Sequence, residues 1–225
     1  MASKFSDRLR RRAAPVWRRT FAHPFVRGIG NGTLPPDRFR FYLAQDYVFL
    51  VEYCRVLGLA AAKAPDLETM GRFADLLHAT LRAEMDLHRA AARRFGLTPA
   101  ALERTRPAPT CHAYTRHLLH VAATGSLAEV VASLLPCQWG YSEIGRRLQR
   151  RGLPRRRPLY AEWIRTYASP EFAALAEWLR GLTDRLARGA GAAERRRMAD
   201  LFLTSSRYEH AFWEMSYRKE RWPVP

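Results

Sequence analysis

The sequence predicts an all-α fold, a multi-helix bundle, on three observations. Apolar residues recur mostly at helical spacing, and alternating strand-like runs bounded by turn residues are missing. No linker, repeat or low-complexity tail divides the 225 residues. A chain of this length can bury a sizeable core, so residues 1–225 are expected to form a single helical domain.

The N-terminal region predicts two helices. The first, with Phe5, Leu9 and Val16 turned inward, is expected to end near residues 21–23. Pro24 can open a short second helix that stops in the glycine-rich segment 28–32.

A long helix is expected to start around residues 35–36 and to run to about residue 64. Its apolar stripe consists of Phe39, Leu43, Asp46, Leu50, Tyr53 and Leu57, so a carboxylate interrupts it. Because a buried carboxylate without partners costs several kcal/mol, Asp46 should be paired, hydrogen-bonded or turned to a cavity. A structural pair with an arginine and a role in ligand binding both remain open.

The middle of the chain predicts a helix from about residue 66 to residue 94 that ends at Gly96. It carries Phe73, Leu77, Leu81, Glu84 and His88. Residues 98–99 read as a cap and first turn, and residues 105–110 as a connector. A further helix, residues 111–124, contains Tyr114, and Gly125 separates it from the next.

The segment SLLPCQWGYSEIG, residues 133–145, is unusual for a core helix. Ser133, Cys137 and Tyr141 follow one another at i, i+4 and i+8, so a thiol and a phenol share one face. Pro136 predicts a kink beside the thiol. Cys137 is therefore a candidate nucleophile, whereas Cys54 and Cys111 are expected to be buried small hydrophobic residues.

The C-terminal third begins with a charged turn, RRLQRRGLPRRRP, residues 146–158. Helices are then expected over residues 158–167, 170–186 and 192–217. The last one carries Glu209 among Tyr208, Phe212, Trp213 and Tyr217, and this carboxylate raises the same question as Asp46.

The composition limits the classes of partner. The net charge is +17, but only three of the 38 basic residues are lysine and the arginines are spread over most segments. This distribution favours solvated faces over nucleic-acid binding, which is the weakest hypothesis. No stretch approaches the ~18 apolar residues of a membrane span, and the Arg-rich N-terminus lacks the apolar run of a secretory signal. Three cysteines without a CxxC pair favour a reducing, cytoplasmic location.

A metal site is the obvious competitor to a cysteine site. Glu84 and His88 stand at i, i+4, and His117 and His120 at i, i+3. Di-metal bundles need two Glu-x-x-His pairs and further glutamates, and the sequence has no such duplicated motif. His112, His117 and His120 are therefore expected at the surface or the edge of the core, and no metal ligands are assigned.

Six segments together resemble the TenA family, also called thiaminase II, in its cysteine-containing branch. They are FYLAQDYVFL, RAEMDLHR, PAPTCHAYTRHL, LAEVVASLLPCQWGYSEIG, WIRTY and SSRYEHAFWEMSYRKE. The resemblance covers almost the whole chain in family order. It implies a heme-oxygenase-like helical bundle, a homotetramer, and no metal or organic cofactor.

The resemblance also implies an activity: hydrolysis at the methylene group attached to a 4-amino-2-methylpyrimidine, in thiamin salvage. The implied small-molecule substrates are 4-amino-5-aminomethyl-2-methylpyrimidine, which gives the hydroxymethylpyrimidine and ammonia, and thiamin itself. By position, Cys137 matches the nucleophile, Asp46 the carboxylate that holds the aminopyrimidine edge, and Glu209 the acid/base carboxylate. Tyr114 matches the stacking aromatic residue, and Tyr141 and Tyr167 the phenols of the pocket.

Phe49 departs from the family pattern, because it stands where a pocket tyrosine is common. One neutral hydrogen bond is worth about 0.5–1.5 kcal/mol, so its loss could slow turnover or change the preferred leaving group. His112 and Gln138 also replace residues that are often aromatic. Two alternatives stay open: a non-catalytic pyrimidine-binding or regulatory protein, and an oxidase of the same helical fold.

Overall fold

The computed structural model describes residues 3–224, except the side chains of residues 83, 84, 86–88 and 91. Every regular element within them is helical, so the predicted all-α class is confirmed. The chain divides into two compact units, which we describe one at a time. Unit 1 consists of Met1–Leu34 and Val131–Glu214, and unit 2 of Pro35–Val130 and Met215–Pro225. The single domain over residues 1–225 stays a prediction.

Unit 1 begins with three short helices, α1 (Phe5–Arg12), α2 (Ala14–Ala22) and α3 (Pro24–Asn31). The single first helix predicted from the sequence was wrong, because the helix breaks at Ala13. Pro15, in the first turn of α2, lacks the N–H that would continue the helical hydrogen bonds. Trp17 points inward instead of the half-buried Val16. The predicted end of α3 is confirmed, since Gly32 caps it with a φ of 76°.

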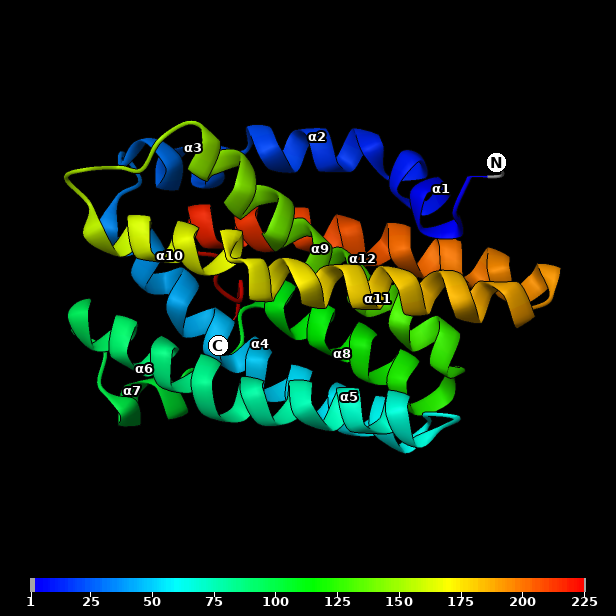
Figure 1. Cartoon of the computed structure of the whole chain (residues 1–225). Helices are drawn as coiled ribbons and strands as arrows, with labels where there is room; N and C mark the ends of the chain where they lie inside the picture. Colours follow the sequence, from blue (N-terminus) through cyan, green and yellow to red (C-terminus); the bar gives the residue numbers. More distant parts are fainter. Residues whose placement is uncertain (1–2, 225) are drawn as a thin grey trace. The chain divides into compact units, whose positions relative to one another are not determined.

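The rest of unit 1 comes from the second half of the chain. It contains α9 (Leu127–Arg150) from Val131 onward, α10 (Pro158–Ala168), α11 (Pro170–Gly189) and α12 (Ala192–Arg218) as far as Glu214. The helix α1 lies along α11, and α10 packs against both α3 and α11 (Figure 1). These helices match the predicted ones closely, and α9 continues through Pro136. The kink at Pro136 stays a prediction.

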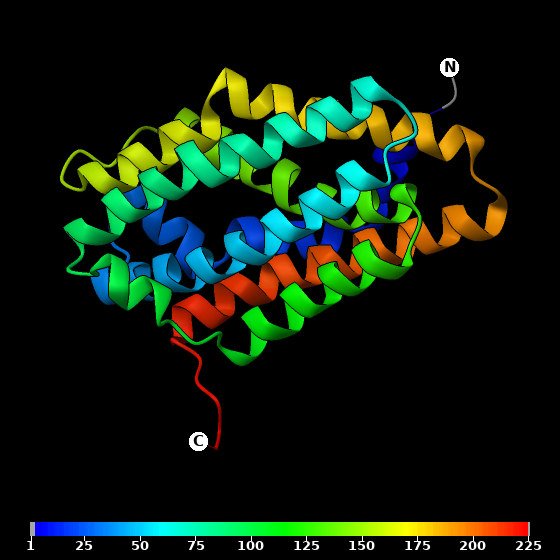
Figure 2. The same cartoon turned by 90° about the horizontal axis from the view of Figure 1, so that it is seen from below.

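Unit 2 is built around the long helix α4 (Pro36–Ala62). Packed against it are α5 (Leu67–Ala79), α6 (Met85–Arg94), α7 (Pro99–Glu103) and α8 (Pro109–Thr124), with α4 running blue to cyan in Figure 2. The stripe predicted for this helix is confirmed as buried: Phe39, Leu43, Asp46, Leu50, Tyr53 and Leu57. Because the helix is covered on several sides, a carboxylate on it cannot reach open solvent easily.

The helix predicted over residues 66–94 is interrupted by a π-helical turn, η1 (Thr80–Glu84). Asp66 caps the first part by accepting a hydrogen bond from the Thr69 backbone N–H at 2.7 Å. Leu81 on this turn is 49% exposed. The buried line of this helix instead runs through Thr69, Phe73, Leu76 and Thr80. The side chains of Glu84 and His88 lie outside the described residues.

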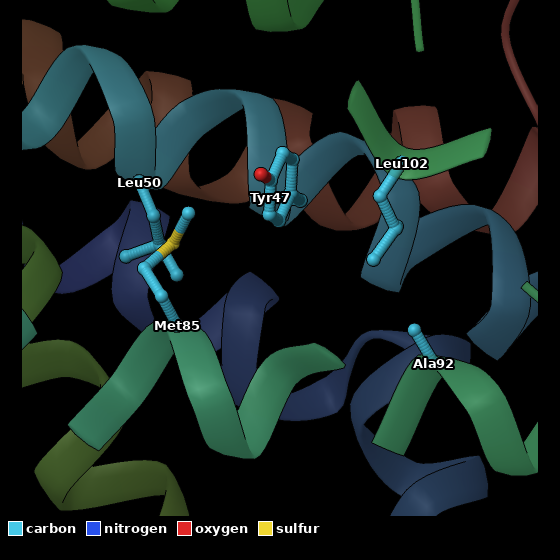
Figure 3. Close-up of a cluster of buried hydrophobic side chains, with 5 residues drawn as sticks. All are labelled: Tyr47, Leu50, Met85, Ala92 and Leu102. Atoms are coloured by element: carbon cyan, nitrogen blue, oxygen red, sulfur yellow. The ribbon is translucent and has the colours of Figure 1, made fainter. Parts of the chain in front are cut away.

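A buried cluster joins α6 and α7 to α4. Tyr47 and Leu50 project from α4, Met85 and Ala92 from α6, and Leu102 from α7 (Figure 3). Met85 meets Leu50, and Leu102 points toward the space between the helices (Figure 3). Burying such side chains stabilises by about 1.5–3 kcal/mol each. The cluster holds in place the part of α4 that also carries Asp46 and Phe49.

None of the helices within residues 3–224 combines the length and the apolar character that crossing a bilayer requires.

Candidate functional site

The predicted site residues form two groups, one in each unit. Unit 2 holds Asp46, Phe49 and Tyr114, and unit 1 holds Cys137, Tyr141, Tyr167 and Glu209. All of them lie on helices of at least eleven residues rather than on loops. Helical positions restrict side-chain movement, as a site that orients a small substrate requires.

Asp46 is a buried carboxyl group that titrates near neutrality. Burial raises its pKa from 3.8 to about 7, and a hydrogen bond from the Tyr42 side chain, one turn earlier on α4, acts in the opposite direction. An arginine partner would lower the pKa, so the direction of the shift argues against the structural ion pair considered from the sequence. A carboxyl group with this pKa can either donate or accept a proton at physiological pH.

Phe49 follows Asp46 by three positions on α4 and packs against Tyr114 of α8. The ring centroids of Phe49 and Tyr114 are 5.1 Å apart and their planes meet at 39°. Tyr53, one turn later on α4, stacks on Phe49 with ring centroids 5.9 Å apart. Offset aromatic contacts of this kind restrict the orientation of the rings, so the packing of Phe49 helps to fix the orientation of the Tyr114 ring.

The three cysteines are not equivalent. Cys54 and Cys111 are buried, whereas Cys137 is partly exposed. Burial raises the pKa of Cys111 to about 12, with further contributions from the charges of Asp46 and Glu52. Its thiol contacts the Gln45 carbonyl oxygen at 3.5 Å. Since the thiolate is the nucleophile, Cys111 is unreactive, and the expectation that Cys54 and Cys111 are buried is confirmed.

An aromatic cluster surrounds the two phenols of unit 1. Tyr141 lies one turn after Cys137 on α9, and its ring centroid is 4.7 Å from that of Tyr167. Trp163 lies 4.6 Å from Tyr167, and Trp213 lies 5.2 Å from Tyr141. No site role was predicted for either tryptophan from the sequence. Their spacing could have indicated a site role, because Trp163 precedes Tyr167 by one helical turn and Trp213 follows Glu209 by one helical turn.

Gly145 sets the distance between α9 and the end of α10. A Cβ atom at this position would lie 2.5 Å from the Tyr167 carbonyl carbon and 2.6 Å from the Ala168 nitrogen. Backbone atoms cannot move aside as a flexible side chain can, so the contact requires glycine. The close approach of Tyr167 to Tyr141 therefore depends on the last residue of the SLLPCQWGYSEIG segment.

Glu209, on α12, is buried beside a small cavity of about 10 Å³. Pro136 and Gly140, which flank Cys137 in the α9 sequence, and Trp213 also line this cavity. Ser206 also lines the cavity, and its hydroxyl accepts a hydrogen bond from the Trp17 indole N–H at 3.0 Å. The volume is close to that of one water molecule, so the Glu209 carboxylate can have a single water beside it.

The histidines considered as competing metal ligands lie on α8, the helix that carries Tyr114. His112 and His120 are exposed and His117 is half-buried, as predicted. In the part of the chain whose side chains are described, no three His, Cys, Asp or Glu residues converge on a point that a metal ion could occupy.

A family-wide sequence profile matches residues 10–219. The chain belongs to the TENA/THI-4/PQQC family. This membership confirms the resemblance to TenA proteins, and the match includes every predicted site residue.

Known relatives agree over nearly the full length. An aminopyrimidine aminohydrolase of Halalkalibacterium halodurans is 46% identical over 97% of this chain and 97% of its own. A TenA homologue from P. horikoshii superposes with a TM-score of 0.88 at 32% identity, covering 96% of this chain and 99% of the other. A Shewanella denitrificans domain described as having a heme-oxygenase-like fold reaches 0.73 at 12% identity, covering 95% and 92%.

These relatives confirm two further predictions. The helical bundle is of the heme-oxygenase-like type. The protein is an enzyme of the hydrolase class, on the strength of its family and of a curated hydrolase at 46% identity.

Proposed function

We propose that the protein is a thiamin-salvage hydrolase acting on 4-amino-5-aminomethyl-2-methylpyrimidine, with thiamin as a second substrate. The products from the first are 4-amino-5-hydroxymethyl-2-methylpyrimidine and ammonia. The names of the aminohydrolase relatives support the substrate class. The chemistry of the seven site residues supports the reaction.

In the proposed reaction, Cys137 is the nucleophile. Its thiolate adds to an electron-poor ring carbon while an acid protonates a ring nitrogen. Electrons of the resulting enamine then expel ammonia from the methylene carbon. Water adds to that carbon and gives up a proton, and the thiolate leaves to restore the aromatic ring. The net change is one amine replaced by one hydroxyl group, with water consumed and ammonia released.

Asp46 and Glu209 are the proposed proton carriers. Asp46, with a pKa of about 7, can hold the aminopyrimidine edge through hydrogen bonds and share a proton with a ring nitrogen. Glu209 lies beside a water-sized cavity and is suited to protonate the leaving amine and deprotonate the incoming water. Tyr114 offers the ring face for stacking, and Tyr141 and Tyr167 supply phenols that orient the thiol and substrate.

One observation carries this proposal: the difference between the three thiols. Cys137 is partly exposed and stands one turn from the phenol of Tyr141, whereas burial and two carboxylates suppress ionisation of Cys111. A reactive thiolate must be both accessible and formed at working pH. Cys137 alone of the three is exposed enough for this role.

The test is a product assay with aminomethylpyrimidine and thiamin in parallel. The intact protein should release hydroxymethylpyrimidine from both and ammonia from the first. Cys137→Ala should abolish turnover, while Cys111→Ala, the matched control, should retain it. Circular dichroism should show the same helical content in all three proteins. Retained turnover in Cys137→Ala, or no product from the intact protein, would reject the proposal.

We further propose a cytoplasmic homo-oligomer, a tetramer by resemblance to the family. Among the described residues no cysteine is part of a disulfide, which suits a reducing compartment. Support for association comes from an apolar stripe on α5 and η1, made of the exposed Leu67, Met70, Ala74 and Leu81 and the half-buried Leu77. Leu67 is 83% exposed and Met70 40% exposed. Their spacing of three and four residues is that of a coiled-coil seam.

The occupant proposed for the stripe is α5 of a second copy, packed antiparallel about a two-fold axis near Ala74. This arrangement places Leu67 opposite Leu81 of the second copy, so that the stripe pairs with itself. Glu68 and Arg82 lie on the same side of the stripe, at its opposite ends. The two-fold axis places Glu68 near Arg82 of the second copy, and Arg82 near Glu68 of the second copy. Opposite charges at these ends favour the antiparallel pairing over the parallel one.

A further inference from the structure

The segment between α9 and α10 carries more positive charge than its surroundings neutralise. Residues 146–157 contain seven arginines and no acidic residue. Within residues 3–224, Arg147 is the one member paired with a carboxylate, that of Glu143 at 3.4 Å. Neighbouring like charges destabilise a fold, so a local excess of this size favours a bound anion.

Three of these arginines converge on one hollow of about 330 Å³. Its lining consists of Asn31, Gly32, Pro154, Arg155, Arg156 and Arg157. No acidic side chain is among them, and none of them belongs to the group around Cys137. Guanidinium groups form paired hydrogen bonds with phosphate oxygens, which gives such a hollow a chemical preference.

The walls of the hollow are held in place by the chain around Gly32. With its φ of 76°, Gly32 lets Pro154 and Arg157 approach closely, since a Cβ atom there would lie 3.1 Å from the Pro154 Cβ. The Arg157 Nε donates to the Gly32 carbonyl oxygen at 3.4 Å. Behind them, the buried Tyr160 hydroxyl donates to the Leu34 carbonyl oxygen at 2.9 Å. The hollow is thus preformed, which lowers the entropy cost of binding.

Asn31 adds hydrogen-bond donors to the hollow. Its side-chain oxygen accepts hydrogen bonds from the Thr33 N–H at 3.1 Å and from the Thr33 hydroxyl at 2.7 Å. These contacts fix which end of the amide is the acceptor, and the NH₂ end keeps two donors. Donors and positive charge without a carboxylate are what an anionic oxygen ligand requires.

We infer that this hollow binds the phosphate groups of a small phosphorylated molecule. The volume falls in the range of small-ligand pockets, above the size of a lone phosphate ion, and three guanidinium groups suit a diphosphate or a phosphate monoester better than a monoanion. The site is distinct from the proposed catalytic residues, and the inference does not depend on the proposed hydrolysis.

Calorimetry with inorganic pyrophosphate, at constant ionic strength, tests the inference. The double variant Arg155→Gln, Arg156→Gln should weaken binding about tenfold or more. Arg150→Gln, Arg151→Gln removes the same charge from the same segment outside the hollow and should change affinity by less than about twofold. Gly32→Ala keeps the charge but crowds the wall, and should also weaken binding. Equal losses in both double variants, or no pyrophosphate binding, would overturn the inference.

Two further probes identify the source of the phosphate. Phosphatidylglycerol vesicles and a short single-stranded RNA are titrated into the same proteins. The inference expects pyrophosphate to bind at the hollow while vesicles and RNA show no dependence on Arg155 and Arg156. Binding of vesicles or RNA that depends on these arginines more strongly than pyrophosphate binding does would reject the small molecule. Turnover of aminomethylpyrimidine should be the same in both double variants, which separates this test from that of the hydrolase.

Discussion

The Phe49 ring lies against the Tyr114 ring with centroids 5.1 Å apart, and both rings are buried. The residue that matches the family's pocket tyrosine is therefore an apolar support for the proposed stacking aromatic. Position 49 is then expected to control how tightly the substrate ring is oriented, and not merely whether a hydroxyl is present.

Phe49→Tyr should raise kcat/KM for aminomethylpyrimidine. One added neutral hydrogen bond is worth about 0.5–1.5 kcal/mol, which corresponds to roughly two- to tenfold in rate. Steady-state kinetics with aminomethylpyrimidine and thiamin would measure this effect and any change of preference. Phe73→Tyr, which places a hydroxyl at a fully buried position of α5 instead of α4, is the control and should lower the melting temperature without changing kinetics. An unchanged kcat/KM in Phe49→Tyr would mean that the hydroxyl at this position has no role.

Asp46→Asn should stabilise the protein at alkaline pH. The folded-state pKa is raised from 3.8 to about 7, so the folded protein holds a proton that the unfolded chain releases. The contribution of Asp46 to the free energy of unfolding is fully present below pH 3.8, declines as the pH rises, and is lost above about pH 7. By linkage the difference is at most about 4 kcal/mol. Melting temperatures of both proteins from pH 5 to pH 9 should converge at the acid end and separate at the alkaline end, and parallel curves would contradict the assignment.

His23 should make stability fall on acidification. Its Nδ1 accepts the Phe25 backbone N–H at 3.1 Å and caps α3, which leaves Nε2 to face Glu214 at 2.8 Å. Burial lowers the pKa of His23 although Glu214 opposes the shift, and burial also lowers the pKa of His210, whose ring lies 5.4 Å away. Arg19 acts on His210 in the same direction as burial.

Because both folded-state pKa values are depressed, the unfolded chain binds more protons. Stability is therefore full above about pH 6.5 and declines below it. His23→Asn keeps a capping acceptor without the titration and should flatten the acid limb of the melting curve. His23→Ala also lacks the titration and should be about 1 kcal/mol less stable than His23→Asn at every pH. The measurement is thermal unfolding between pH 5 and pH 8. An acid limb unchanged in His23→Asn would show that another group causes it.

The apolar stripe of α5 predicts that one added charge disrupts association. Because the proposed contact is two-fold symmetric, Leu67→Glu places one carboxylate from each copy in the apolar stripe. The variant should therefore form a smaller assembly. Light scattering coupled to size-exclusion chromatography would measure the molar mass. Val224→Glu changes an apolar residue that is 68% exposed and does not belong to the stripe, and it should leave the mass unchanged. A monomeric parent protein, or equal effects of both variants, would exclude the seam.

Much of the fold could be predicted because its local signals agree with its long-range packing. Prolines open α10 and α11 and Gly32 closes α3, so their predicted positions were accurate. The break at Ala13 was missed because the helical pattern continues across it, while its cause is the missing N–H of Pro15. Periodicity reports which face is apolar, but it does not report a local interruption of the backbone hydrogen bonds.

The candidate site was predictable in part. The sequence separated Cys137, which shares a face with Tyr141, from the buried Cys111. Only the fold shows that burial and two carboxylates raise the pKa of the Cys111 thiol. The sequence likewise marked Asp46 as out of place, but its pKa depends on the burial of α4 and on Tyr42. The aromatic cluster of Trp163 and Trp213 was missed because aromatic residues at helical spacing are ordinary core residues.

The π-helical turn at residues 80–84 changes which side of the next helix faces the core. On an uninterrupted α-helix, Leu81 and Met85 would share a face, yet Leu81 is 49% exposed and Met85 is 4% exposed. A π-helical turn takes more residues to complete one rotation, so the residues after it face a different direction than they would on a regular α-helix. The extra residue of this turn brings Met85 and Ala92 into phase with the buried line of Thr69, Phe73, Leu76 and Thr80, so that they face Tyr47 and Leu50. The extra residue of the π-helical turn thus allows one stretch of chain to have an exposed apolar stripe before the turn and a buried apolar face after it.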